Sequence, residues 1–184
     1  MSIKVILKAR KVSMTGDQYI ELHAEETTIY KRGFFFEAGK ILVQLAKRNQ
    51  VPTLIALAEI DNIDTYDTLY GVGTSEKILE LVTKLIASKC RTSDVIASMG
   101  EGKIGIIFYN ITKVNAQKTL EGLSEAIANH IFLINQEEKH VTVHIGGTIM
   151  QNRLNSGTID SLYEQATLAL EAVKKRADGS VIVY

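Results

Sequence analysis

The residues best suited to chemistry in this sequence are charged side chains around one short turn. Arg91 and Asp94 stand three positions apart, where a predicted helix ends and a predicted strand begins. A guanidinium can donate two parallel hydrogen bonds, and a carboxylate can accept them. Glu101 and Lys103 place one acid and one base in the turn that follows. We therefore expect a functional site, if the sequence shows one, at this hairpin and the charges beside it.

Simpler structural roles stay open for each of these residues. Arg91 could interact with the last carbonyls of the preceding helix, and Asp94 could be an ordinary turn residue. Glu101 and Lys103 are typical of a solvated pair at the tip of a turn.

Two other sets of side chains deserve a structural interpretation first. Tyr66 and Tyr70 lie four positions apart on a short predicted helix, where they could flank a purine, although helix packing explains them more simply. His140 and His144 are predicted to share one strand face, but no third metal ligand lies nearby in the sequence. We therefore predict no metal site from these residues.

Composition places the chain among ordinary globular proteins. Its 184 residues suffice for one domain with a core and a small appendage. Lys plus Arg and Asp plus Glu both number 21, so no overall charge favours nucleic acid or a membrane surface as partner. The single cysteine, Cys90, excludes an internal disulfide and a multi-cysteine metal cluster. Because no apolar run is long enough to span a membrane or to serve as a signal peptide, we expect a cytoplasmic protein.

The turn at residues 100–103 is predicted to join two strands. Apolar residues alternate over Val95–Met99 and again over Ile104–Tyr109, and a glycine-containing loop between such runs is typical of a β-hairpin. The two glycines of the loop can adopt positive φ. Further strands are predicted over Thr53–Ile60, Val141–Ile149 and Val181–Tyr184.

Helical spacing of apolar residues predicts five helices around these strands. They cover residues 34–45, Ile63–Tyr70, a stretch containing residues 78–86, residues 116–127 and residues 162–173. The hydroxyl of Thr74 or Ser75 is expected to cap the third helix. Residues 1–24 are interpreted as an N-terminal β-hairpin extension. Residues 25–184 are interpreted as one α+β domain, with a mixed, largely antiparallel sheet flanked by helices.

Several stretches together resemble the GGDEF family of diguanylate cyclases, over roughly Arg32–Tyr184. These stretches are KRGFF at residues 31–35, EIDNIDTYDTLYG at 59–71, RTSD at 91–94, VTVHIGG at 141–147 and ATLALEAVK at 166–174. Their order and spacing carry the resemblance, because no single stretch is specific. The resemblance implies a ferredoxin-like palm, which the family shares with class III nucleotide cyclases.

The chain departs from the family at the positions implied to be catalytic. In active members, acidic residues at the third and fourth positions of the signature turn serve metal binding and catalysis; here these positions are Gly102 and Lys103. The metal-binding aspartate at the end of the first core strand corresponds to Glu59. One carboxylate facing an ammonium is a poor substitute for the converging oxygens that two divalent cations need. The resemblance therefore implies an inactive cyclase without a cofactor, and Mg²⁺ only if residual GTP binding exists.

The positions implied to bind GTP are also altered. The family's guanine-binding asparagine and aspartate correspond to Asp67 and Glu76. An ionised Asp67 can accept but cannot donate, so the pairing of an amide with the base edge is lost. Lys174 matches a phosphate-binding lysine, but the arginine expected four residues later is Asp178. Asp67, Glu76 and Lys174 thus match the family's nucleotide site only in part.

Arg91 and Asp94 keep the spacing of the family's RxxD motif, and Gly100 follows at the expected distance. In the family this pair forms an inhibitory site for the product, cyclic di-GMP. The sequence therefore favours a catalytically inactive GGDEF-like domain that senses cyclic di-GMP through Arg91 and Asp94. Two alternatives stay open: a residual diguanylate cyclase or GTP-binding enzyme that uses Glu59, and a nucleotide-free domain that forms homodimers or binds a signalling protein.

Overall fold

The computed structural model describes residues 30–150, 157–176 and 180–184. The predicted N-terminal hairpin of residues 1–24 and the predicted start of the domain at residue 25 lie outside these residues and stay predictions. Within the described ranges, no helix is long and apolar enough to cross a membrane.

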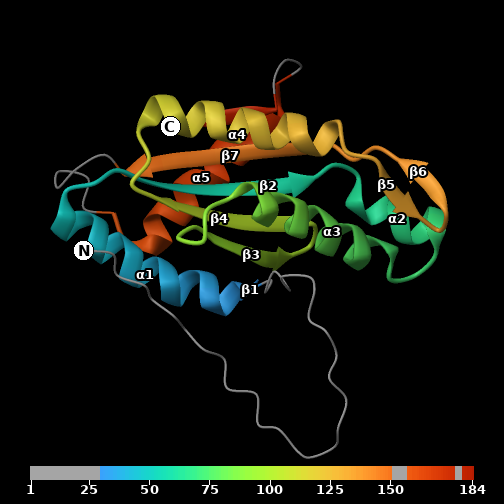
Figure 1. The fold of residues 1–184 in the computed structure, drawn as a ribbon, viewed down its shortest axis with the longest axis horizontal. Helices are drawn as coiled ribbons and strands as arrows, with labels where there is room; N and C mark the ends of the chain where they lie inside the picture. The colour runs from blue at the N-terminus through green and yellow to red at the C-terminus, as the bar shows by residue number, and fades with distance from the viewer. Residues whose placement is uncertain (1–29, 151–156, 177–179) are drawn as a thin grey trace, which may run out of the picture.

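One six-stranded mixed sheet forms the centre of the molecule (Figure 1). Its strands, in spatial order, are β1 (Tyr30–Lys31), β3 (Val95–Gly100), β4 (Lys103–Tyr109), β2 (Thr53–Ile60), β7 (Val143–Met150) and β8 (Val181–Val183). The four inner strands pair antiparallel, whereas the edge strands β1 and β8 pair parallel with β3 and β7. The predicted mixed, largely antiparallel sheet is confirmed.

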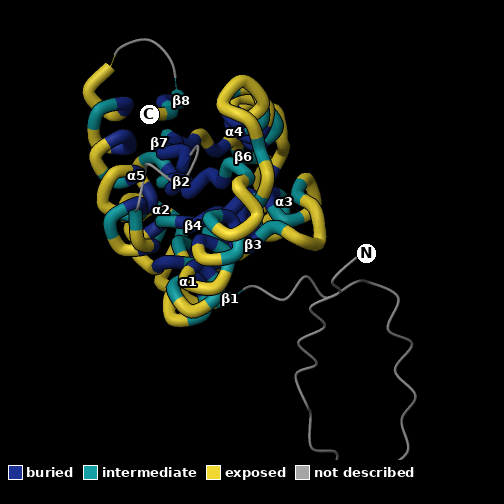
Figure 2. Tube along the Cα trace, turned by 90° about the vertical axis from the view of Figure 1, so that its left-hand side faces the viewer, coloured by how far each residue is buried: buried dark blue, intermediate teal, exposed yellow. Residues whose placement is uncertain are grey.

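Helices cover both faces of this sheet. They are α1 (Arg32–Asn49), α2 (Ile63–Tyr70), α3 (Thr74–Lys89), α4 (Lys113–Ala128) and α5 (Ile159–Lys174). Helices α1 and α5 pack on one face, and α3 and α4 pack on the other (Figure 2). The chain order β2-α3-β3-β4-α4-β7, with the spatial order β3-β4-β2-β7, is the ferredoxin-like arrangement that the resemblance implied.

The central strand β2 is buried on both faces. Its residues alternate between two separate apolar clusters, so that Leu54 and Ala56 face α3 and α4, whereas Ile55 and Leu57 face α1 and α5. Only Glu59, near the end of the strand, is half-buried instead of buried. Because helices cover both faces, β2 appears in the sequence as a nearly continuous apolar run.

Helix α5 lies directly against β7, at a point where no side chain fits. A Cβ atom on Gly146 would lie 2.0 Å from the backbone nitrogen of Leu170 and 2.4 Å from its Cα. Backbone atoms cannot move aside as a flexible side chain can, so this contact requires glycine. The contact holds α5, with Lys174 in its last turn, over the sheet.

Two features of the second half of the chain were not predicted correctly. A separate hairpin, β5 (Phe132–Ile134) and β6 (Glu137–Lys139), was missed, because its strands are short and β6 contains no apolar residue. Its turn residues have positive φ, as in a type I′ turn, but they are Asn-Gln and lack the glycine that usually signals this turn. The expectation that His140 and His144 share a strand face is wrong, because β7 begins only at Val143.

Candidate functional site

The charged residues singled out in the sequence lie at opposite ends of β3. Arg91 and Asp94 precede this strand, and the turn containing Glu101 follows it. The strand has 6 residues, and at about 3.3 Å per residue it separates the two groups by about 15–20 Å. The expectation that these charges gather beside one turn is therefore wrong, and the two ends have to be described separately.

At the first end, Asp94 binds the backbone of its own turn. Its Oδ2 accepts a hydrogen bond from the backbone N–H of Arg91 at 2.8 Å, and the Asp94 N–H donates to the Arg91 carbonyl at 3.0 Å. These bonds close the connection between α3 and β3. The Arg91 side chain is exposed, and neither it nor Asp94 Oδ1 has a polar partner among the described residues.

Burial affects the ionisation of two groups at this end. It raises the pKa of Asp94, against the hydrogen bond and the charge of Arg91, which lower it. Burial and the neighbouring charge of Asp94 also raise the pKa of the Cys90 thiol to about 12. Cys90 therefore stays protonated near neutral pH and behaves as a small apolar group. Arg91 is exposed and accessible to a ligand, and Asp94 beside it is half-buried.

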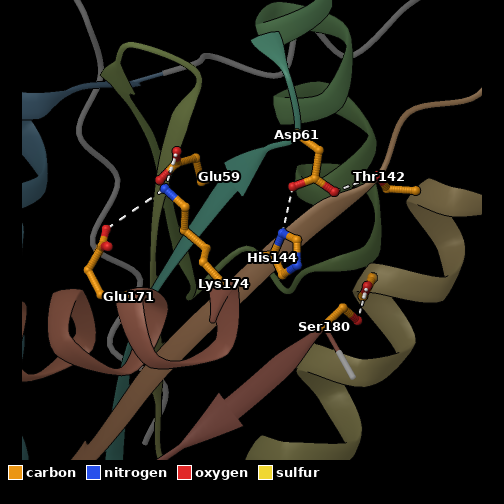
Figure 3. A network of polar contacts seen from close by, with 8 residues as sticks. Glu59, Asp61, Thr142, His144, Glu171, Lys174 and Ser180 are labelled. Atoms are coloured by element: carbon orange, nitrogen blue, oxygen red, sulfur yellow. Dashed lines mark hydrogen bonds and ion pairs between the residues drawn. The ribbon is translucent and has the colours of Figure 1, made fainter. Parts of the chain in front are cut away.

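At the second end of β3, Glu59 forms an ion pair with Lys174, which also lies near Glu171 (Figure 3). Glu59 is opposite Lys103 in the β2–β4 ladder, and its Oε1 is 2.8 Å from Nζ of Lys174. The hydrogen bond to Glu59 raises the pKa of Lys174, because it outweighs the opposing effect of burial. The N–H of Ile60 donates to the Gly102 carbonyl at 3.0 Å, which confirms that the turn lies at the end of β2.

The lysine of the turn has its own acidic neighbour. Lys103 Nζ lies 3.9 Å from Glu101 Oε2, and the Glu101 side chain is 90% exposed. This geometry is that of a solvated turn pair. The second carboxylate oxygen of Glu59, Oε2, is different: it is buried and has no hydrogen-bond partner among the residues that the structure describes. Such an atom carries a desolvation cost and would favour a cation or a donor.

Gly102 has a backbone conformation and surroundings that suit only glycine. Its φ is +71°, and a Cβ atom built on it would lie 2.6 Å from Cγ2 of Ile63. Left-handed backbone is unfavourable for residues with a side chain. An acidic side chain therefore does not fit at position 102 in the observed backbone.

Asp67 caps α3 from the neighbouring helix. Its Oδ1 accepts from the Ser75 N–H at 2.8 Å and its Oδ2 accepts from the Ser75 hydroxyl at 2.9 Å, and these bonds lower the pKa of Asp67. The expectation that Thr74 or Ser75 caps this helix is wrong, since the N-cap residue is Gly73 and Asp67 supplies the oxygens. Glu76, in the first turn of α3, is exposed.

A polar network around Asp61 was missed in the sequence. Its Oδ1 lies 2.6 Å from Nδ1 of His144, and its Oδ2 accepts from the Thr142 hydroxyl at 2.5 Å (Figure 3). Because an ionised carboxylate can only accept, Nδ1 of His144 is the donor in this hydrogen bond. The antiparallel pairing of β2 with β7 brings these residues together. The sequence did carry a signal, because the polar residues of EID (59–61) and of TVH (142–144) are two positions apart, which is the spacing of residues on one face of a strand. That these two pairs of residues meet became clear only from the pairing of the strands.

A family comparison identifies the domain. The sequence profile described as "Diguanylate cyclase, GGDEF domain" matches residues 23–180. The chain belongs to the GGDEF family. A curated relative of this GGDEF domain is the probable diguanylate cyclase DgcE of Escherichia coli (strain K12), which is 22% identical over 182 residues. The match covers 99% of this chain but only 16% of DgcE.

Solved GGDEF domains have the same fold. The GGDEF domain of DgcB from Caulobacter crescentus, in complex with c-di-GMP, superposes with a TM-score of 0.76 at 18% identity, covering 84% of this chain and 91% of that one. The active GGEEF domain of a diguanylate cyclase from Vibrio cholerae gives 0.76 at 19% identity, covering 85% and 98%. At these identities the likeness shows the fold, and the α+β assignment is confirmed.

The structure sorts the predicted site residues of this GGDEF domain into three places. Glu59 and Lys174 are in contact at the end of β2, and Lys103 is the partner of Glu59 in the β2–β4 ladder. Asp67 and Glu76 lie at the start of α3, and the RxxD residues lie before β3. Within the described part of the chain, no three His, Cys, Asp or Glu side chains are grouped so that they could hold a metal ion.

Proposed function

We propose that this GGDEF domain is catalytically inactive and senses cyclic di-GMP through Arg91 and Asp94. The observation that carries the proposal is the exposed guanidinium of Arg91 beside a carboxylate with one unused oxygen. The guanidinium could donate to O6 and N7 of a guanine, and Asp94 Oδ1 could accept from the N2 amino group of the same base. Asp94 is held in place by its bonds to the turn, so binding a ligand would cost little of its conformational entropy.

A relative with the same fold supports this choice of ligand. The solved GGDEF domain of DgcB from Caulobacter crescentus is in complex with c-di-GMP. The spacing of Arg91 and Asp94 before the hairpin is that of the motif described above. Cyclic di-GMP carries two guanines and two phosphates, and the guanidinium of Arg91 suits either group.

The end of β2 supports the absence of catalysis, because its residues do not fit a pair of divalent cations. Glu59 is half-buried near the end of β2, and one of its oxygens already contacts Lys174 at 2.8 Å. Gly102 contributes no side chain, and Lys103 lies opposite Glu59. A divalent cation at Glu59 would therefore compete with the Lys174 ammonium and would find no acidic side chain at positions 102 and 103. We expect no conversion of GTP to cyclic di-GMP.

Calorimetry with cyclic di-GMP and with GTP, each with and without Mg²⁺, tests the proposal. We expect binding of cyclic di-GMP alone. Arg91→Ala should cost roughly 1–3 kcal/mol, as for bidentate arginine–guanine contacts, which is tenfold or more in affinity. Lys89→Ala removes a nearby exposed cation at the end of α3 and serves as the matched control, with an expected loss below about threefold.

Each part of the proposal has its own contrary result. A folded Arg91→Ala variant that binds as tightly as the parent would remove the site from consideration. Product formed from GTP by the parent, and abolished by Glu59→Ala, would show the residual cyclase instead. If neither nucleotide binds the parent, the interaction domain takes the place of the sensor.

A further inference from the structure

A polar hollow of about 300 Å³ lies between α2 and the β5–β6 hairpin. Figure 1 shows these elements together beyond one end of the sheet. The lining residues come from the segment Asp61–Tyr70, from the end of β6 and from the residues that lead into β7. The volume lies at the lower limit of sites for small molecules. None of Arg91, Asp94, Asp67 and Glu76 lines it.

The walls of this hollow are fixed by contacts within the domain. The side-chain amide of Asn135 donates to the Tyr70 carbonyl at 2.8 Å, and Nζ of Lys139 lies 4.9 Å from the centre of the Tyr70 ring. Both contacts hold the hairpin against the end of α2. On the opposite wall, Asp61 is held by Thr142 and His144. A ligand would therefore enter a shape that already exists, and it would not have to order these segments.

Aromatic rings form one wall. The rings of Tyr66 and Tyr70 lie 5.9 Å apart at 35°, so they contact each other and leave no gap of about 7 Å in which a base could be sandwiched. The earlier suggestion that they flank a purine is therefore wrong. They could instead offer a surface to one face of a planar ring, with the ring of His140 nearby in the same lining. Burial raises the pKa of Tyr66, so its hydroxyl remains a donor.

Polar groups of different character surround these rings. Lys139 pairs with Glu137 at 2.7 Å, and an ammonium group has three protons, so it can also bind a second anion. The Asp61 carboxylate already accepts from two donors, which spreads its negative charge, and it keeps lone pairs for a hydroxyl group. The side-chain amide of Asn62 is exposed and has no hydrogen-bond partner among the described residues.

We propose that this hollow binds a nucleoside monophosphate. The base would lie against Tyr66 and Tyr70, and the phosphate would contact Lys139. The ribose hydroxyls would contact Asp61 and Asn62. The proposal does not depend on the cyclic di-GMP site, because the two sets of residues are disjoint.

NMR titration of the ¹⁵N-labelled chain tests this assignment, with GMP and AMP as ligands. Ribose 5-phosphate lacks the base, adenosine lacks the phosphate, and 4-hydroxybenzoate has only an aromatic ring and an anionic group. We expect GMP or AMP to bind with a Kd below about 1 mM and to shift signals of α2 and of the β5–β6 hairpin. Each of the three partial ligands should bind at least tenfold more weakly.

Five variants locate the binding. Lys139→Gln should weaken nucleoside monophosphate binding tenfold or more, whereas Lys113→Gln, an exposed lysine at the start of α4, should leave it unchanged. Tyr66→Ala should also weaken binding, and Tyr66→Phe, which keeps the ring and the packing, should retain most of it. Arg91→Ala should have no effect.

The contrary results are equally definite. If no nucleoside monophosphate shifts these signals at millimolar concentration, the hollow is not such a site. If ribose 5-phosphate binds as well as GMP, the rings play no part and the proposal is wrong. If binding survives Lys139→Gln unchanged, or is lost in Arg91→Ala, the ligand sits elsewhere.

Discussion

The two ends of β3 both carry charged residues, but their charges have different partners. At the turn end, Glu59 and Lys174 are 2.8 Å apart, and Lys103 has Glu101 beside it. At the other end, the exposed Arg91 has no ionic partner among the described residues. A charge that is paired inside the domain contributes to stability, and a ligand must break that pair to use it. An exposed guanidinium without an ionic partner loses only bound water when a ligand binds, and no ion pair has to be broken. The comparison predicts that substitutions affect stability at the turn end and binding at the Arg91 end.

The largest effect is expected for Asp94→Asn. The loss of a charge-assisted hydrogen bond should reduce the affinity for cyclic di-GMP roughly tenfold or more. The raised pKa of Asp94 means that folding favours its protonated form, so its contribution to stability is present at low pH and is lost as the pH rises through the raised pKa. Near neutral pH the neutral amide should therefore not lower the stability.

Calorimetry and urea unfolding of the same Asp94→Asn preparation would check both expectations. Ser93→Ala, an exposed neighbour, is the control. A variant that lost stability but kept its affinity for cyclic di-GMP would show that Asp94 contributes to stability and not to binding.

The next effect concerns restoration of the acidic pair at the turn. The double variant Gly102→Asp, Lys103→Glu should lose about 1–3 kcal/mol of unfolding free energy, because position 102 is left-handed and faces Ile63. We also expect it to form no cyclic di-GMP from GTP. Lys103→Glu alone, which adds no Cβ at position 102, should be closer to the parent in urea unfolding. Formation of cyclic di-GMP by the double variant would show that the backbone can rearrange to accept a side chain at position 102 and that the restored turn can support catalysis.

A smaller effect is expected for Lys174→Met. The ion pair with Glu59 is more than a third exposed at the lysine, so solvent screening limits its contribution to about 0.2–1 kcal/mol. Because the pKa of Lys174 is raised, this contribution is present below the ordinary lysine value of about 10.4 and is lost as the pH rises through the raised pKa. Thermal unfolding of parent and variant should therefore differ at pH 8 and converge in strong alkali. Lys84→Met, which removes an exposed pair on α3, is the matched control. A difference that persists in strong alkali would assign the effect to packing of the lysine stem.

The smallest effect is expected for Asp67→Asn, between the two ends. The amide can replace only one of the two oxygens that accept from Ser75, so the melting temperature should fall slightly at neutral pH. The pKa of Asp67 is lowered in the fold, so its contribution is present above the ordinary aspartate value and is lost as the pH falls through the lowered pKa. Melting curves of parent and variant should therefore converge in acid. Asp64→Asn, an exposed carboxylate in the first turn of α2, is a control for the change of charge alone.

Much of the fold could be predicted from the sequence, because its signals are local. Helical and alternating patterns gave all five helices and the long strands, since each pattern reflects which faces of an element are buried. The spacing of Arg91 and Asp94, and the loss of the acidic pair at positions 102 and 103, were equally visible in the chain. The strands β1, β5 and β6 were missed because they have two or three residues, too few to show a period.

Only the tertiary structure decided which of these charges meet. Lys174 and Glu59 are 115 residues apart, and the packing of α5 on Gly146 brings them together. The register of β2 with β7 places the side chain of His144 beside Asp61, which follows β2, and the length of β3 separates Arg91 from the turn. Contacts of this kind depend on strand register and helix placement, which arise from the burial of both faces of the sheet. No local pattern in the sequence records them.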